Sequence, residues 1–148
     1  MITIRLTLQL PQPIDVVWSE LTDWAANSKW IPQTVVTVTK ETGGVGTEFV
    51  GVSKAGPIEL VDRMRVTVSM PPSGEFASAR VEKVGPVLFG EAGFDLKANQ
   101  GGTTLVWFET VSLKSAALTT IAKPFLTPVA WVLFRFALGG FARTLNRQ

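Results

Sequence analysis

The chain has 148 residues, a formal net charge of +2, and no cysteine, histidine or tyrosine. The absence of cysteine excludes disulfides, thiolate metal sites and cysteine nucleophiles. The absence of histidine excludes Ser-His-Asp and Cys-His catalysis, so any acid–base chemistry must use Asp, Glu or Lys. The length fits one domain, which we expect to span residues 1–148 without a metal or other cofactor.

Residues 2–10, ITIRLTLQL, alternate strictly between apolar and polar side chains. This period of two predicts a strand with one buried and one solvated face. The alternation differs from the continuous apolar core of a signal peptide, and no cleavage pattern follows it. Together with the lack of cysteine, this favours a cytoplasmic protein.

Two short helices are expected next, over residues 13–22 and 24–29. Pro13 suits a helix start, and Asp15 in the first turn interacts favourably with the helix dipole. The second helix must end before Pro32, because the residue preceding a proline avoids helical geometry. Three tryptophans, Trp18, Trp24 and Trp30, lie six residues apart here, a spacing that fits neither one helix face nor one strand face.

Strand and turn patterns fill the chain after Pro32. Glycine- and proline-rich turns at 43–46, 55–57, 71–74 and 99–102 separate segments rich in β-branched and aromatic residues. The GGVG turn is not a phosphate loop, because a strand-like segment follows it where such a loop requires a helix. Six further antiparallel strands are expected, over residues 34–39, 47–53, 59–70, 76–84, 91–98 and 103–113.

The last segment changes to a helical pattern. Thr127 and Pro128 fit an N-cap followed by proline at the first helical position, which predicts a helix over residues 128–147. Its apolar side chains cover more than half of the circumference, so a concave sheet or a membrane must contact it. A membrane span is disfavoured, because Arg135 would lie at the middle of the bilayer.

Positive charge is concentrated at the end of the chain. Residues 115–148 contain Lys123, Arg135, Arg143 and Arg147 and no acid, whereas residues 1–114 carry a net charge of −2. Such a segment is typical of cations near a helix C-terminus, and it also fits an anionic partner or a membrane surface. Nucleic-acid binding is not expected, because acidic residues are interleaved with the basic residues of the β-strands.

The segment LPQPIDVVWSELTDWAANSKWIP, residues 10–32, resembles the N-terminal signature of the START/Bet v 1-like (SRPBCC) superfamily. The segments GVGTEF and GGTTLVW also resemble its turn-to-strand motifs. The polyketide cyclase/dehydrase and lipid-transport group is the most similar part of the superfamily. The matching positions of the signature are Pro13, Val17, Trp18, Thr22, Asp23, Trp30 and Pro32.

The resemblance implies an α+β helix-grip fold of order β-α-α-β6-α. In that fold a curved, seven-stranded antiparallel sheet wraps a long C-terminal helix, and a cavity lies between them. The two short helices would then plug one end of the sheet, with their tryptophans as the apolar filling. This arrangement accounts for a spacing that follows no single helix face.

Two acids fall on apolar strand faces when side chains are sorted by alternation. Asp62 shares a face with Leu60 and Met64, and Glu109 shares one with Trp107 and Val111. A buried carboxylate has a raised pKa unless a base pairs with it. Few inward-facing bases can be identified, so we expect water and ligand to be the partners of Glu109. A β-bulge in either strand would turn the acid outward.

These patterns predict a protein that binds a hydrophobic or amphipathic small molecule in an internal cavity. One alternative is an aromatase/cyclase-type enzyme using Glu109 or Asp62 on a poly-β-keto substrate, and another is a lipid or quinone chaperone that contacts membranes through its C-terminal helix. Catalytic residues and oligomeric state are not predicted. The expected ligand-binding residues are Phe49, Asp62, Met64, Phe94, Trp107, Glu109, Trp131 and Leu133.

Overall fold

A single antiparallel sheet of seven strands, with the order β1-β7-β6-β5-β4-β3-β2, forms most of the protein. The computed structural model describes residues 1–146. The strands are β1 (Ile2–Leu10), β2 (Thr34–Lys40), β3 (Glu48–Ala55), β4 (Ile58–Ser73), β5 (Phe76–Pro86), β6 (Leu88–Asn99) and β7 (Gly102–Leu113). The helices are α1 (Ile14–Thr22), the 3₁₀ helix η1 (Trp24–Lys29) and α2 (Ala116–Asn146).

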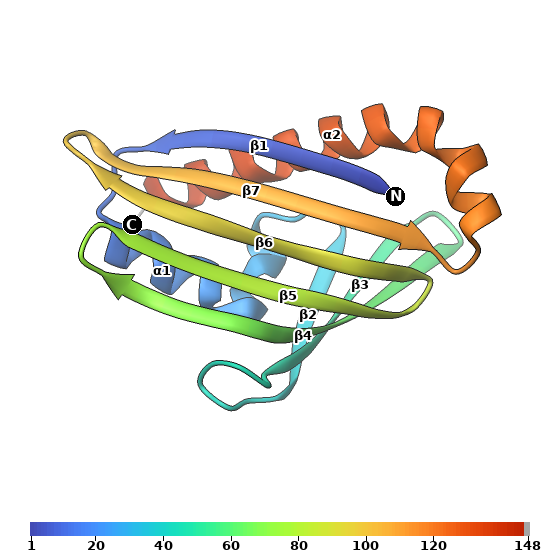
Figure 1. Cartoon of the computed structure of the whole chain (residues 1–148), viewed down its shortest axis with the longest axis horizontal. Helices are drawn as coiled ribbons and strands as arrows, with labels where there is room; N and C mark the ends of the chain where they lie inside the picture. Colours follow the sequence, from blue (N-terminus) through green and yellow to red (C-terminus); the bar gives the residue numbers. More distant parts are fainter. Residues whose placement is uncertain (147–148) are drawn as a thin grey trace.

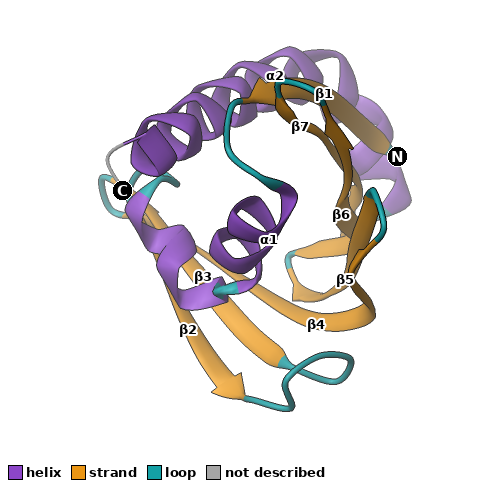
Figure 2. Ribbon diagram, turned by 90° about the vertical axis from the view of Figure 1, so that its left-hand side faces the viewer, coloured by secondary structure: helices purple, strands orange, loops and turns teal. Residues whose placement is uncertain are grey.

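The sheet curves strongly, and the helices occupy different parts of its inner side (Figures 1 and 2). α1 lies inside the curve, where it contacts β4, β5, β6 and β7. α2 runs along the β1 end of the sheet and packs chiefly on β1 and less on β7. The sequence order therefore predicted the architecture well: one strand, two short helices, six antiparallel strands and a long helix.

The main core lies between the inner face of the sheet, α1 and the second half of α2. In β1, the alternating residues Ile2, Ile4 and Leu6 are buried as predicted. The tryptophans of the α1–η1 region join this core by ring contacts, which fasten the two short helices to strands and to α2. The ring pairs, with their centroid distances, are Trp18–Phe94 (5.8 Å), Trp24–Phe49 (4.7 Å), Trp30–Trp107 (6.0 Å) and Trp30–Phe141 (5.3 Å).

The predicted start of the C-terminal helix was wrong. α2 begins at Ala116, and Pro124 and Pro128 both lie inside it. Pro128 lacks the N–H that would donate to the carbonyl of Pro124, and Pro124 lacks its own N–H, so each proline removes one hydrogen bond of the helix. The helix bends in its first half instead of ending there (Figure 1), as proline-containing helices do. The predicted end, residue 147, lies outside the described residues.

The first turn of α2 is joined to the end of β7. The Thr119 hydroxyl accepts a hydrogen bond from the Leu113 amide at 2.8 Å and donates one to the Ser115 carbonyl at 3.0 Å. These bonds hold the helix start at the sheet edge ahead of the two prolines. None of the helices within residues 1–146 has both the length and the apolar character needed to cross a bilayer.

The second half of α2 should contribute much of the stability through a few anchor residues. Leu138 is fully buried, whereas Leu133 on the same helix is 58% exposed. We expect Leu138→Ala to lower the free energy of unfolding by about 2–5 kcal/mol, because it deletes a packed side chain and leaves a cavity. Leu133→Ala, the matched control, should change it by less than about 0.5 kcal/mol. Urea denaturation measures both, and equal losses would contradict this packing.

Candidate functional site

A buried lysine lies on the inner face of β5. Ala77, Ala79, Val81 and Lys83 alternate along the strand and are all buried, so the lysine continues an otherwise apolar face. The side chain of Lys83 is only 5% exposed. A buried ammonium requires anionic or hydrogen-bonding partners, since burial of an unpaired charge is very costly.

Two carboxylates supply these partners. The Lys83 ammonium donates a short hydrogen bond to Asp62 Oδ2 and lies 3.0 Å from Glu109 Oε1. The side chains of Asp62 and Glu109 are 15% and 5% exposed, so the whole group is shielded from water. We call these three residues the inner charge cluster. It brings together β4, β5 and β7, which are not all adjacent in the sheet.

Small residues on β6 allow Lys83 and Glu109 to meet. β6 separates β5 from β7, and in its register Gly90 pairs with Lys83 while Ala92 pairs with Glu109. Neither residue places a bulky side chain between the ammonium and the carboxylate. Glycine is also required at position 90, because a Cβ there would lie 2.0 Å from the Thr110 carbonyl oxygen and the φ angle is +131°.

A β-bulge brings Asp62 to the same point. Asp62 of β4 pairs with Pro86 of β5, whereas Met64 pairs with Lys83. The register therefore advances by two residues on β4 and by three on β5, as in a β-bulge. Both β4 side chains therefore reach the lysine, and Met64 Sδ lies 3.8 Å from its Nζ. The sequence-based prediction treated a bulge as a feature that would turn an acid away. Here the bulge accompanies an inward acid.

One ammonium must compensate two carboxylates, and this imbalance sets the protonation states. Burial opposes the charged form of Lys83, but Glu109 and Asp62 together outweigh it and raise the lysine pKa above its usual value. Burial likewise raises the pKa of Glu109, and the attraction of Lys83 offsets this only in part. Lys83 thus stays protonated, and Glu109 takes up a proton more readily than an ordinary glutamate.

The cluster leaves polar atoms unused. Asp62 Oδ1 is buried without a hydrogen-bond partner among the described residues, and the same is true of Trp107 Nε1. Trp107 precedes Glu109 by two positions on β7, so both side chains point to the same face. An acceptor and a donor are therefore both available on the inner side of the sheet.

Aromatic rings cover the inner face beside the cluster. Trp107 stacks on Phe94 of β6 and on Phe134 of α2, with centroids 6.2 Å apart in both pairs. Phe49 of β3 belongs to a second, smaller cluster with Val66 of β4 and Ala92 of β6. The charged groups thus adjoin apolar surface on both sides.

The structure brings six of the eight predicted ligand-binding residues to the inner face. Asp62, Met64 and Glu109 meet at Lys83. Phe94 and Trp107 stack on each other in the main core, and Phe49 lies in the smaller cluster. All six therefore remain candidates for contact with a ligand.

Trp131 and Leu133 are placed differently. They are 46% and 58% exposed, so their inward placement by the helical wheel needs correction. α2 presents Phe134 to Trp107 instead, and Leu138 and Phe141 continue the buried side. Apolar residues cover so much of the helix that the wheel alone did not indicate which part faces the sheet.

Lys83 was missed, and the expected partners of Glu109 were wrong in consequence. We expected water and ligand beside Glu109, but Lys83 forms an ion pair with it. The signal was present in the segment AxAxVxK, residues 77–83, where the same alternation that placed Glu109 inward also places the lysine inward.

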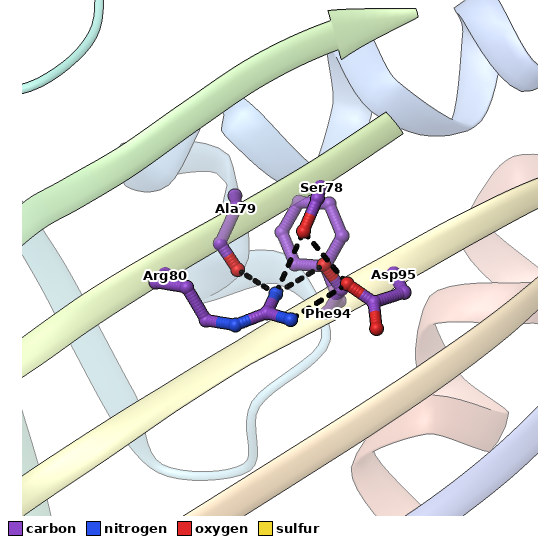
Figure 3. A network of polar contacts seen from close by, with 5 residues as sticks. All are labelled: Ser78, Ala79, Arg80, Phe94 and Asp95. Carbon is purple, nitrogen blue, oxygen red and sulfur yellow. Dashed lines mark hydrogen bonds and ion pairs between the residues drawn. The ribbon is translucent and has the colours of Figure 1, made fainter. Parts of the chain in front are cut away.

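A second polar network lies between β5 and β6, and its charges are fully paired (Figure 3). Arg80 donates hydrogen bonds to Ser78 Oγ and to the carbonyls of Ala79 and Phe94, and it lies 2.9 Å from Asp95 Oδ1. Its guanidinium also covers the Phe108 ring at 4.3 Å. Arg80 is half-buried, and its contacts hold the two strands together.

Comparison with known proteins supports the architecture. The family described as polyketide cyclase/dehydrase and lipid transport matches residues 1–146. Among curated proteins, none matches significantly. The chain is similar to the crystal structure of TTHA0849 from Thermus thermophilus, with a TM-score of 0.81 and 14% identity over 98% of this chain and 97% of that one.

Two further solved structures share the fold. One is the Zhui aromatase/cyclase from Streptomyces sp. R1128, with a TM-score of 0.73 and 17% identity over 98% of this chain and 93% of that one. The other is Ara h 8.0201, with a TM-score of 0.64 and 15% identity over 96% and 97% of the two chains. The helix-grip fold predicted from the sequence is thus confirmed.

Removal of Lys83 should destabilise the protein, because the two carboxylates of the inner charge cluster lose their cation. We expect Lys83→Met to lower the free energy of unfolding at pH 7 by about 3–5 kcal/mol, because it leaves two buried carboxylates without a cation. Acidification should restore part of the loss, because burial raises the pKa of Glu109 and the lysine no longer offsets this effect. Denaturant titrations at pH 4.5 and pH 7 test this. Lys40→Met, at an exposed lysine of β2, is the control and should show neither effect.

Glu109 should show the opposite pH dependence from an ordinary surface acid. Its folded-state pKa is raised, so its contribution to stability is present below the unfolded pKa of about 4.3 and is lost as the pH rises through the folded pKa. We expect Glu109→Gln to be more stable than wild type at pH 8, by about 1 kcal/mol in the free energy of unfolding, and to lose this advantage near pH 4. Denaturation at several pH values, with exposed Glu91→Gln as control, measures the difference. A difference that does not vary with pH would refute the assignment.

Proposed function

The chain belongs to the polyketide cyclase/dehydrase and lipid-transport family of the START/Bet v 1-like superfamily, and on that premise we propose that it binds an amphipathic small molecule on the inner side of its sheet. The apolar part of the ligand packs on the aromatic rings of that face. Its polar end lies against the inner charge cluster. Such a ligand matches both the apolar rings and the charged groups of this face.

The observation that carries the proposal is the cluster itself. A purely structural core of this size gains little from a buried ion pair, because apolar residues of the same volume stabilise a fold as well or better. Here the pair is also imbalanced, and Asp62 Oδ1 has no partner among the described residues. Shifted pKa values and unused polar atoms on one apolar face are typical of a site that receives a polar group.

The chemistry of the cluster indicates the class of ligand. Lys83 is a donor that suits a carbonyl, phenolate or carboxylate oxygen, and Asp62 Oδ1 is an acceptor that suits a hydroxyl. Trp107 and Phe134 supply flat apolar surface next to these groups. A molecule with an aromatic or acyl body and an oxygen-bearing end meets all three requirements, as polyketides and many lipids do.

The protonation behaviour of Glu109 favours a second candidate function, an aromatase/cyclase. A carboxyl with a raised pKa is suited to proton transfer near neutral pH, which is what a protein without histidine needs. In such an enzyme Glu109 accepts a proton from a carbon between two carbonyls, and the Lys83 ammonium stabilises the enolate oxygen. The enolate carbon then attacks a second carbonyl of the same poly-β-keto chain, and Glu109 returns its proton to the alkoxide that forms. Loss of this hydroxyl together with a proton of the neighbouring carbon, as water, and enolisation of the remaining carbonyls complete the aromatic ring.

A pair of matched probes tests the binding proposal. 8-Anilinonaphthalene-1-sulfonate and N-phenyl-1-naphthylamine share an apolar body, and only the first carries an anionic group. Glu109→Gln removes one negative charge beside Lys83, so we expect the affinity for the sulfonate to rise at least about fivefold relative to the neutral probe. Fluorescence titration measures both dissociation constants. Native mass spectrometry of the purified protein adds a direct search for a retained ligand.

Controls separate the two candidate functions. Glu91→Gln makes the same charge change at an exposed position of β6 and should leave the affinity ratio unchanged. An unchanged ratio in Glu109→Gln would place the probes elsewhere and overturn the proposal. If the protein is a cyclase, Glu109→Gln loses turnover of a poly-β-keto thioester while it keeps its affinity for the neutral probe.

A further inference from the structure

From Val129 onward, α2 has two apolar faces, and the core covers only one of them. Ala137, Leu138, Phe141 and Leu145 are buried against the core. On the opposite side, Val129, Val132, Leu133 and Phe136 follow one another at helical spacing and are all exposed. A surface helix of a soluble protein normally places charged residues there, so this exposed row requires an explanation.

Arginines accompany the exposed row. Arg135 and Arg143 are exposed, and neither forms an ion pair with any described residue. The Arg143 guanidinium lies 5.9 Å from the centre of the Phe136 ring, so cation and apolar surface adjoin. We call Val129, Val132, Leu133, Phe136, Arg135 and Arg143 the outer face of α2. Residues 115–148 contain no acid that would weaken its positive charge.

A groove beside this face adds a further cation. It has a volume of about 430 Å³ and lies between the η1–β2 connection and α2. Lys29 lines one side, Arg143 and Phe136 line the other, and no acidic side chain is among its lining residues. Gly140 permits the close approach, since a Cβ there would lie 3.2 Å from the Trp30 carbonyl oxygen. The groove therefore offers two cations to an anionic group of modest size.

We propose that the outer face of α2 docks on the surface of an anionic lipid membrane. The apolar row enters the boundary between headgroups and acyl chains, Arg135 and Arg143 contact lipid phosphates, and the groove receives one such phosphate between Lys29 and Arg143. This combination of apolar residues and unpaired cations on one helix face is the chemistry of interfacial helices. The inference is independent of the ligand-binding proposal, because it concerns the opposite side of α2.

The charge of the face argues against a second copy of the chain as the occupant. In a two-fold symmetric dimer the same patch meets itself. Both copies would then bring Arg135 and Arg143 into the interface, and residues 115–148 supply no acid to compensate these charges. An anionic lipid surface, in contrast, attracts the arginines and accepts the apolar row.

Vesicle co-sedimentation with the full-length protein tests the proposal. We expect binding to phosphatidylcholine vesicles that contain phosphatidylglycerol, weak binding to phosphatidylcholine alone, and a decrease at high salt. Phe136→Ser should weaken binding about tenfold, because an apolar side chain no longer enters the interface. Arg135→Gln combined with Arg143→Gln should weaken it about fivefold per cation.

Matched controls exist for both changes. Phe76 on β5 is 60% exposed, as Phe136 is, and Lys97 lies 5.8 Å from its ring centre, so Phe76→Ser repeats the chemistry at another site. Arg5→Gln combined with Arg63→Gln repeats the charge change at exposed positions of β1 and β4. Equal loss in control and test variants would overturn the proposal, as would absence of binding to the anionic vesicles. A micromolar dimer by light scattering that Phe136→Ser dissociates would replace the membrane with a second copy.

Discussion

The contact of one buried ammonium with two carboxylates is the interaction on which the inner side of this protein depends. Lys83 attracts Asp62 and Glu109, and it cannot fully compensate both. The deficit falls on Glu109, the more buried acid, whose pKa rises. The raised pKa of Glu109 thus arises from an incomplete balance of charge, in a chain that contains no histidine.

The surrounding strands show what this contact requires. Gly90 and Ala92 of β6 place no bulky side chain between Lys83 and Glu109. A bulge in the β4–β5 pair brings Asp62 within reach of the lysine. A bulkier residue on β6 or a regular register on β4 would separate the groups. These three strands therefore carry features that stability of the sheet alone does not demand, since an alternating apolar face would pack at least as well.

The sequence predicted most of the fold and only part of the site. Strict alternation placed Glu109 and Asp62 inward, because a side chain on a regular strand has only two directions. The same rule also places Lys83 inward, but the prediction did not include this residue. The start of α2 was not predictable from local signals, because Thr127 and Pro128 match a helix start and yet lie inside the helix, where the bend at the prolines is tolerated.

The orientation of α2 shows a more general limit. A helix with a narrow apolar stripe has one way to face a core, whereas α2 is apolar over more than half of its surface. From the sequence we expected Trp131 and Leu133 on the inner side, whereas the structure places Phe134 there. The residues that the core leaves outside keep their apolar character and lie beside unpaired arginines. The same excess of apolar residues that obscures the packing in the sequence gives the helix a second, exposed apolar surface, the one that we propose docks on a membrane.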